Sequence, residues 1–147
     1  MPESIRLRSG PWPADEVAEY LDGARIPLRI ASQGTYPVVQ SLWFLRDGSQ
    51  LWCATQTDSV LAQRLRRDDR CGFEVSADAP PYRGVRGTGH ATLDPRAAAD
   101  VLPRLIARYL GPEPGQLADW LMSRIASEVA VRIDRLTVTS WDYSGRM

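Results

Sequence analysis

The residues able to do chemistry in this chain are limited in kind. All 18 basic residues are arginine and none is lysine, which excludes a Schiff-base lysine, a P-loop lysine and a lysine general base. An anion site must therefore use arginine, hydroxyl groups or backbone amides. The single histidine, His90, and the two cysteines, Cys53 and Cys71, are too few for a His/Cys metal site of the usual ligand number. We expect both cysteines to be buried free thiols.

Two segments concentrate charge or glycine. Residues 64–70 (RLRRDDR) suit a solvated helix end, where positive charge favours the C-terminal dipole, and an anion clamp is the alternative. Residues 84–89 (GVRGTG) do not read as a dinucleotide fingerprint, because no helix follows them directly. Glycines within a strand indicate a bulge, a barrel bend or a close ligand approach. We expect a bend at Gly89 and a close approach at Gly84.

The elements that must position these residues are mostly strands. Apolar alternation and turn signals predict six of them, over residues 25–32, 37–45, 51–55, 71–76, 82–93 and 128–141. Pro27 favours an edge or bulged position for the first strand. The Asp47-Gly48 pair predicts a hairpin that joins the second and third. A change of apolar parity near Asp134 predicts a bulge in the last strand.

Four helices complete the prediction. The first opens at residues 11–15 and stops at Gly23. The second is capped by residues 57–59 and runs to about residue 67, with Val60, Leu61 and Leu65 on its inner face. The third follows Asp94-Pro95, and Pro103 should kink or split it. Pro114 starts the fourth.

The predicted fold is mainly β, of the α+β kind: a six-stranded antiparallel barrel with peripheral helices, in a single domain that covers residues 1–147. Zero formal net charge and a pI near 6.6 argue against a nucleic-acid partner, which would need a basic surface. No apolar run is long enough to cross a membrane, and residues 1–10 do not resemble a signal peptide. We expect a cytoplasmic protein without a membrane partner.

Four segments, in this order, resemble the pyridoxamine 5′-phosphate oxidase-like split-barrel superfamily, and within it the flavin- and deazaflavin-dependent oxidoreductase branch. They are residues 37–44 (PVVQSLWF) with the turn at Gly48, then Thr55 and Ser59 leading into residues 65–70, then residues 82–91 (YRGVRGTGHA), and finally residues 131–133 with 140–142. The resemblance covers roughly residues 14–143, and its specificity lies in the order and spacing of these segments.

The resemblance implies a homodimer of split barrels with a cofactor, FMN or alternatively F420, in a groove between the subunits. The ring of the cofactor would lie along Val39, Gln40, Ser41, Leu42 and Trp43. The phosphate would sit near Thr55 and Ser59, with Arg64 supplying charge. Further cofactor contacts are implied for Arg83, Gly84 and Trp141. An interface would also cover part of the surface of Trp43, Trp52, Trp120 and Trp141, which are many for a small barrel.

We expect an oxidoreductase that passes hydride to a small planar acceptor. The cofactor supplies that chemistry, so the resemblance points to no catalytic side chain. Two alternatives stay open: a non-catalytic protein that binds a flavin or a tetrapyrrole, and a barrel that has lost its cofactor. Val60 and Leu61 favour the last, because the oxidase itself has two basic residues at these positions.

Overall fold

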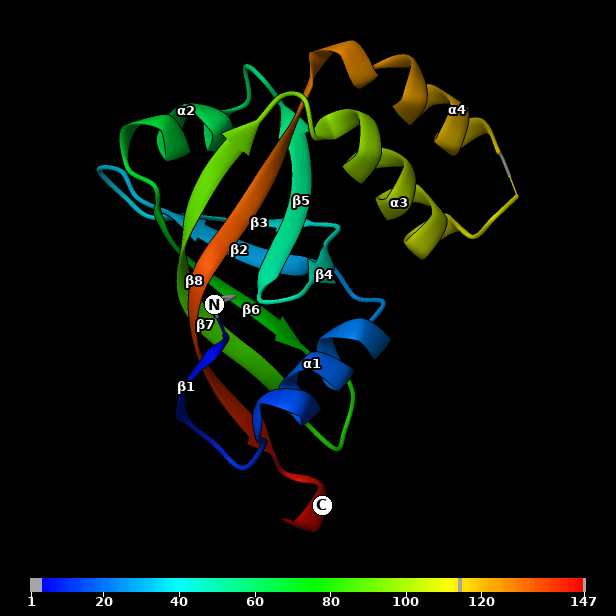
Figure 1. The fold of residues 1–147 in the computed structure, drawn as a ribbon. Coiled ribbons are helices and arrows are strands. Elements are labelled where there is room, and N and C mark those ends of the chain that lie inside the picture. The colour runs from blue at the N-terminus through cyan, green and yellow to red at the C-terminus, as the bar shows by residue number, and fades with distance from the viewer. Residues whose placement is uncertain (1–3, 114, 147) are drawn as a thin grey trace.

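The computed structural model describes residues 4–113 and 115–146. Eight strands and four α-helices, with two short 3-10 turns, follow one another along the chain (Figure 1). The strands are β1 (Arg6–Ser9), β2 (Leu28–Ser32), β3 (Val38–Leu42), β4 (Leu45–Asp47), β5 (Gln50–Gln56), β6 (Arg70–Ser76), β7 (Arg83–Asp94) and β8 (Glu128–Asp142). The helices are α1 (Ala14–Gly23), α2 (Val60–Arg67), α3 (Ala98–Leu110) and α4 (Gln116–Ser123), and the 3-10 turns are η1 (Ile125–Ser127) and η2 (Ser144–Arg146).

All the strands belong to one open, strongly curled sheet that forms a half-barrel (Figure 1). Its order is β3-β2-β6-β7-β8-β5-β4, with antiparallel neighbours throughout, and β1 lies parallel to β8. The mainly β architecture with peripheral helices is therefore confirmed. The predicted number of six strands is wrong, because β1 was not expected and residues 37–45 form two strands.

The division of residues 37–45 has a packing cause. β3 pairs with β2, whereas β4 pairs with β5 at the other end of the sheet. Between them Phe44 is fully buried in the main core. The chain therefore turns inward at Phe44, and this turn interrupts the strand. The hairpin at Gly48 is confirmed for β4 and β5 alone. Pro27 precedes β2, which has neighbours on both sides, so the expected edge position is also wrong.

The main core fills the concave side of the sheet. Val17 and Leu21 of α1 are fully buried there together with strand residues such as Ile30, Leu51 and Ile133. Two smaller clusters pack α3 and α4 against β5 and the start of β8. These helices thus cover the face of β5 that the main core does not use, as the upper right of Figure 1 shows.

Four expectations for the helices have different outcomes. Ser59 is the N-cap of α2, as predicted, and its hydroxyl accepts a hydrogen bond from the Ala62 amide. Val60 is 60% exposed and not on the inner face, because Ala62 takes the buried position beside Leu61. α3 runs through Pro103 as one helix and is not split. Pro114 lies outside the described residues, and α4 begins at Gln116.

The predicted bulge in β8 is confirmed. The register with β7 shifts between Thr88, which pairs with Thr137, and His90, which pairs with Asp134, so that Arg135 and Leu136 lie opposite Gly89 alone. Arg135 adopts a positive φ of 52°. The shift lets Ile133 and Leu136 both face the core although their positions differ in parity. Among the described residues, no helix combines the length and apolar character needed to span a bilayer.

Candidate functional site

β3 presents the segment expected to carry a cofactor ring. It ends the sheet on one side, so one of its backbone edges has no strand partner among the described residues. Side chains alternate along it: Val39, which is 63% exposed, and Ser41 share the outer face with Arg29 and Ala31 of β2. Gln40 and Leu42 point to the other side. An edge strand of this kind offers free N–H and C=O groups to a planar polar ligand.

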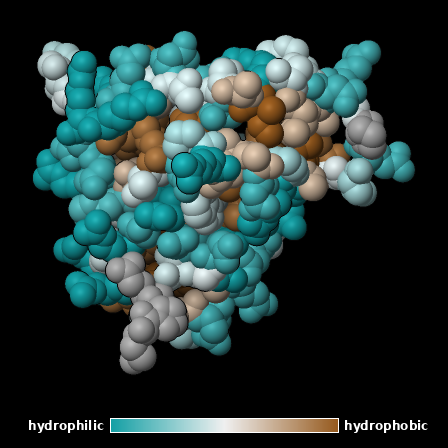
Figure 2. All heavy atoms as spheres, turned by 45° about the horizontal axis from the view of Figure 1, so that its top comes forward, coloured by the Kyte–Doolittle hydropathy of each residue, from teal (hydrophilic) through white to brown (hydrophobic). Residues whose placement is uncertain are grey.

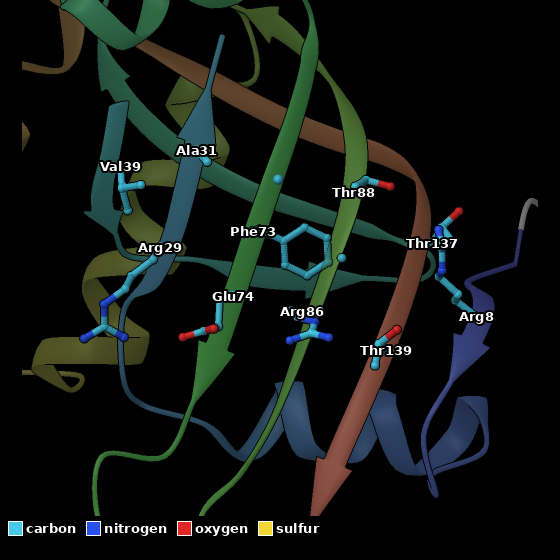
Figure 3. Close-up of a pocket in the computed structure, with 12 residues that line it drawn as sticks. Arg8, Arg29, Ala31, Val39, Phe73, Glu74, Arg86, Thr88, Thr137 and Thr139 are labelled. Carbon is cyan, nitrogen blue, oxygen red and sulfur yellow. The ribbon is translucent and has the colours of Figure 1, made fainter. Parts of the chain in front are cut away.

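On the outer face of the sheet lies a polar depression of about 600 Å³, here called the sheet groove. Arg29, Glu74 and Arg86 stand in register across β2, β6 and β7, and Figure 3 shows Glu74 between the two arginines. Ala31 and Gly72 line it with little or no side chain. Arg8, Val39, Phe73, Gly87 and three threonines complete the lining. With three arginines against one glutamate, the groove favours an anionic ligand.

A second depression of about 330 Å³, here called the helix groove, opens between β3 and the α3–α4 pair. Ser41, Leu42 and Trp43 line it from the sheet. The Trp43 ring stacks on Tyr109 of α3, with centroids 5.1 Å apart and planes 6° from parallel. The Tyr109 hydroxyl donates to the Ile26 carbonyl at 3.0 Å and accepts from the Phe44 amide at 3.3 Å. Tyr109 therefore holds in place the residues that link β3 to β4.

Thr55 and Ser59, the expected phosphate contacts, do lie together. The Thr55 hydroxyl donates to Ser59 Oγ at 2.9 Å, and Ser59 Oγ accepts the Ala62 amide at 3.0 Å. Thr55 is only 9% exposed, so its hydroxyl supports the cap and does not face solvent. The Ser59 hydroxyl proton and the first amides of α2 are the groups that this end of the helix can offer to an anion.

Arg64 is engaged with the loop that leads into β3. Its Nη1 donates to the carbonyl oxygens of Tyr36 at 2.7 Å and Gln33 at 3.2 Å. A Cβ added at Gly34 would overlap the Arg64 guanidinium, so the glycine permits this close approach. Arg64 therefore ties helix α2 to the start of β3, and its charge lies beside this loop.

The expected cofactor contacts on β7 and β8 lie on both faces of the sheet. Gly84 and Trp141 are paired in register on the outer face, and the guanidinium of Arg86 lies 5.9 Å from the Trp141 ring centroid. A Cβ at Gly84 would lie 2.6 Å from Trp141 Cζ2, so the expected close approach is made by this chain's own tryptophan. Arg83 lies on the other face, 6.0 Å from the Tyr20 ring of α1.

The structure thus places Val39, Ser41 and Leu42 on β3 and Trp43 directly after it. Thr55 and Ser59 lie together near the end of β5. Gly84 and Trp141 lie across the sheet from β3: β2 and β6 separate β3 from Gly84 on β7, and β7 itself also separates it from Trp141 on β8. Sequence reasoning missed the contributions of Tyr109 and Glu128 to the helix groove region. Tyr109 lies on α3, and the sequence does not indicate its contact with Trp43. Glu128 begins β8, and nothing in its sequence neighbourhood indicates that it faces a groove.

No protein-family model matches the chain, and no curated protein sequence matches it. Solved structures do. The conserved hypothetical protein Rv2991 from Mycobacterium tuberculosis is 26% identical, with a TM-score of 0.76 over 90% of this chain and 86% of that one. A candidate pyridoxamine 5′-phosphate oxidase from Listeria innocua is 18% identical, with a TM-score of 0.63 over 84% and 95%. An F420 reductase is 22% identical, with a TM-score of 0.65 over 79% and 90%.

The curled sheet with an open edge at β3, together with these likenesses, defines a split barrel. The fold is that of the pyridoxamine 5′-phosphate oxidase-like superfamily, and the resemblance inferred from the sequence is confirmed at this level.

Proposed function

We propose that the chain binds a flavin-type cofactor, FMN or F420, along the edge of β3 and uses it to pass hydride to a small planar acceptor. The observation that carries the proposal is the position of β3: an unpaired edge with a polar groove on one side and an apolar groove on the other. A flavin ring has a polar edge and apolar faces, so this setting suits it. One similar structure is named an F420 reductase, which supports the same class of cofactor.

The residues present fit the cofactor in two respects. The free edge of β3 can hydrogen-bond the ring, while Trp43 and Leu42 exclude water from one side. The first amides of α2 and the Ser59 hydroxyl can bind a phosphate, although Val60 and Leu61 add no charge there. The bound cofactor would accept and donate hydride, and the protein would orient its ring.

The site is completed, on this proposal, by a second copy of the chain. Gly84 and Trp141 share the outer sheet face with Val39 and Ser41 but lie too many strands away to reach the same ligand. Two sheet faces related by a twofold axis would bring Trp141 of one copy toward β3 of the other. The alternating charges of Arg29, Glu74 and Arg86 suit such self-complementary docking.

Absorbance of the freshly purified protein, followed by titration with FMN, F420 and haemin, tests the proposal. We expect FMN or F420 to bind with a spectral shift. Ser41→Glu should weaken binding on the order of tenfold, because it sets a carboxylate beside an anionic ligand. Ser144→Glu is the matched control, since Ser144 is an exposed serine beyond the end of β8. Binding of haemin alone would favour the tetrapyrrole alternative, and binding of none of the three would favour a barrel without cofactor.

A further inference from the structure

The helix groove has a lining that selects its ligand. Seven of its ten lining residues are aliphatic or proline, and Trp43 adds a flat aromatic wall: Pro27, Ser41, Leu42, Trp43, Ala54, Leu102, Leu105, Leu117, Leu121 and Glu128. Figure 2 shows hydrophobic atoms gathered over the α3–α4 region at the upper right. A volume of about 330 Å³ stands at the lower end of ordinary ligand pockets. Such a groove suits a small, flat and largely apolar molecule.

One ionisable side chain, Glu128, lines this groove, and its hydrogen bonds distinguish its two carboxyl oxygens. Gln56 Nε2 donates to Glu128 Oε1. The Ser127 hydroxyl lies 2.9 Å from both Gln56 Oε1 and the Arg124 carbonyl oxygen, and its one proton can be donated to either. The amide of Gln56 is therefore oriented with its donor toward the carboxyl group. Within the described part of the chain, Glu128 Oε2 carries no hydrogen bond, and this oxygen is left for a ligand.

The protonation state of Glu128 follows from its surroundings. Burial raises its pKa above the usual glutamic acid value, and this outweighs the lowering by the Gln56 hydrogen bond and by the charge of Arg124. Gln56 faces it from β5, and Arg124 faces it from the end of α4. The carboxyl group thus keeps its proton to a higher pH than an exposed glutamic acid would. In that neutral form it can donate a hydrogen bond.

We propose that the helix groove binds a neutral, planar and largely apolar molecule through a carbonyl oxygen that accepts a hydrogen bond from Glu128. The lining includes the Glu128 carboxyl group and no basic side chain, and Arg124 lies outside it, so the groove selects against an anion. If the proposed function holds, this molecule is the hydride acceptor. Only this identification of the molecule rests on the proposed function.

Titration of the cofactor-free protein with the neutral naphthyl ketone Prodan tests the inference. Prodan emission responds to the polarity around the dye and to hydrogen bonds at its carbonyl. We expect saturable binding of one molecule per chain, with quenching of tryptophan emission because Trp43 lines the groove. The anionic dye anilinonaphthalene sulfonate should bind at least tenfold more weakly. No binding of Prodan, or equal binding of the two dyes, would overturn the proposal.

Two exposed leucines provide matched variants. Leu117 is 49% exposed and lines the groove, whereas Leu110 is 39% exposed and does not. Leu117→Glu should weaken Prodan binding on the order of tenfold, because a charge replaces an apolar contact. Leu110→Glu should leave binding unchanged. Equal effects of the two substitutions would show that the dye binds elsewhere.

The role of Glu128 is tested by the pH dependence of Prodan affinity. In the unmodified protein, affinity should fall as pH rises through the pKa of Glu128, since the ionised form cannot donate. Glu128→Gln keeps a donor at every pH, so its affinity should not vary, and Glu128→Leu should bind about two- to tenfold more weakly than the unmodified protein at low pH. A pH dependence that persists in Glu128→Gln would remove Glu128 from the interaction.

The two proposals fail separately. A protein that binds Prodan in the groove but neither FMN nor F420 keeps this inference and loses the proposed function. A protein that binds FMN but not Prodan keeps the proposed function and loses this inference.

Discussion

Arg64 makes contacts within the chain that the sequence does not indicate. The family resemblance implies a phosphate contact, which stays a prediction, and the guanidinium donates to the carbonyls of Gln33 and Tyr36. Sequence spacing located Arg64 correctly, one turn beyond Val60. It could not reveal the loop carbonyls, because they come from a segment 28 to 31 residues away. Arg64 therefore affects the site by holding the loop that positions β3.

Replacing Arg64 with leucine should therefore loosen the loop before β3. We expect faster amide hydrogen exchange over residues 33–37 and a loss of about 1–2 kcal/mol in the free energy of unfolding, since hydrogen bonds to a charged donor are removed. Arg66→Leu is the control, because Arg66 is exposed on the same helix. Unchanged exchange in Arg64→Leu would contradict the role of this arginine in holding the loop.

The two thiols should be chemically silent in the folded protein. Cys53 and Cys71 are both buried and free. Burial raises the pKa of each, that of Cys71 to about 12. A raised thiol pKa disfavours the reactive thiolate, so iodoacetamide at pH 8 should label neither cysteine until the protein is unfolded. Mass spectrometry of native and denatured samples measures this, and rapid labelling of the native protein would argue against the burial.

At the scale of elements, apolar periodicity predicted where the strands lie better than it predicted which strands pair with each other. The bulge in β8 was predictable, because a change of parity can be counted in the sequence. The break between β3 and β4 was not, because residues 37–45 are β-favouring throughout and only the burial of Phe44 reverses the path. β1 was missed although Ile5 and Leu7 alternate with Arg6 and Arg8, because the strand has only four residues and all of them are exposed. The helix groove needs contacts between α3, α4 and β3, which no local pattern reveals.

The bulge also yields a stability prediction. Arg135 has a φ of 52°, a left-handed conformation that disfavours side chains branched at Cβ. Its side chain is 61% exposed and lies 3.7 Å from Asp134, so little is lost with the guanidinium. Arg135→Gly should leave the free energy of unfolding unchanged or slightly raised, whereas Arg135→Val should lower it by about 1–2 kcal/mol. Urea denaturation compares the two, and equal effects would refute the assignment of strain.

At the scale of the whole molecule, the sheet face and the tryptophans bear on assembly. Trp120 is 52% exposed, and Trp43, Trp52 and Trp141 are all partly exposed. We expect sedimentation equilibrium at micromolar concentration to give the mass of a homodimer. Arg29→Glu should weaken the dimer, because it reverses a charge in the row that we propose to face the other copy.

Arg96→Glu serves as the control for this prediction, since Arg96 is exposed near the start of α3 and away from the sheet groove. A stable monomer of the unmodified protein would contradict both the predicted dimer and the proposed site between two subunits. Equal weakening by both substitutions would place the contact elsewhere.

The position of β8 affects how the chain can fold while it is being made. β8 joins β1, β5 and β7, yet it follows all of these strands along the chain and is synthesised after them. At about 5–20 residues per second, the ribosome needs on the order of seconds between β7 and the end of β8. During that interval β5 and β7 lack their shared neighbour and expose unpaired edges. The sheet is therefore most exposed to aggregation just before β8 emerges, when a helper that shields strand edges would matter most.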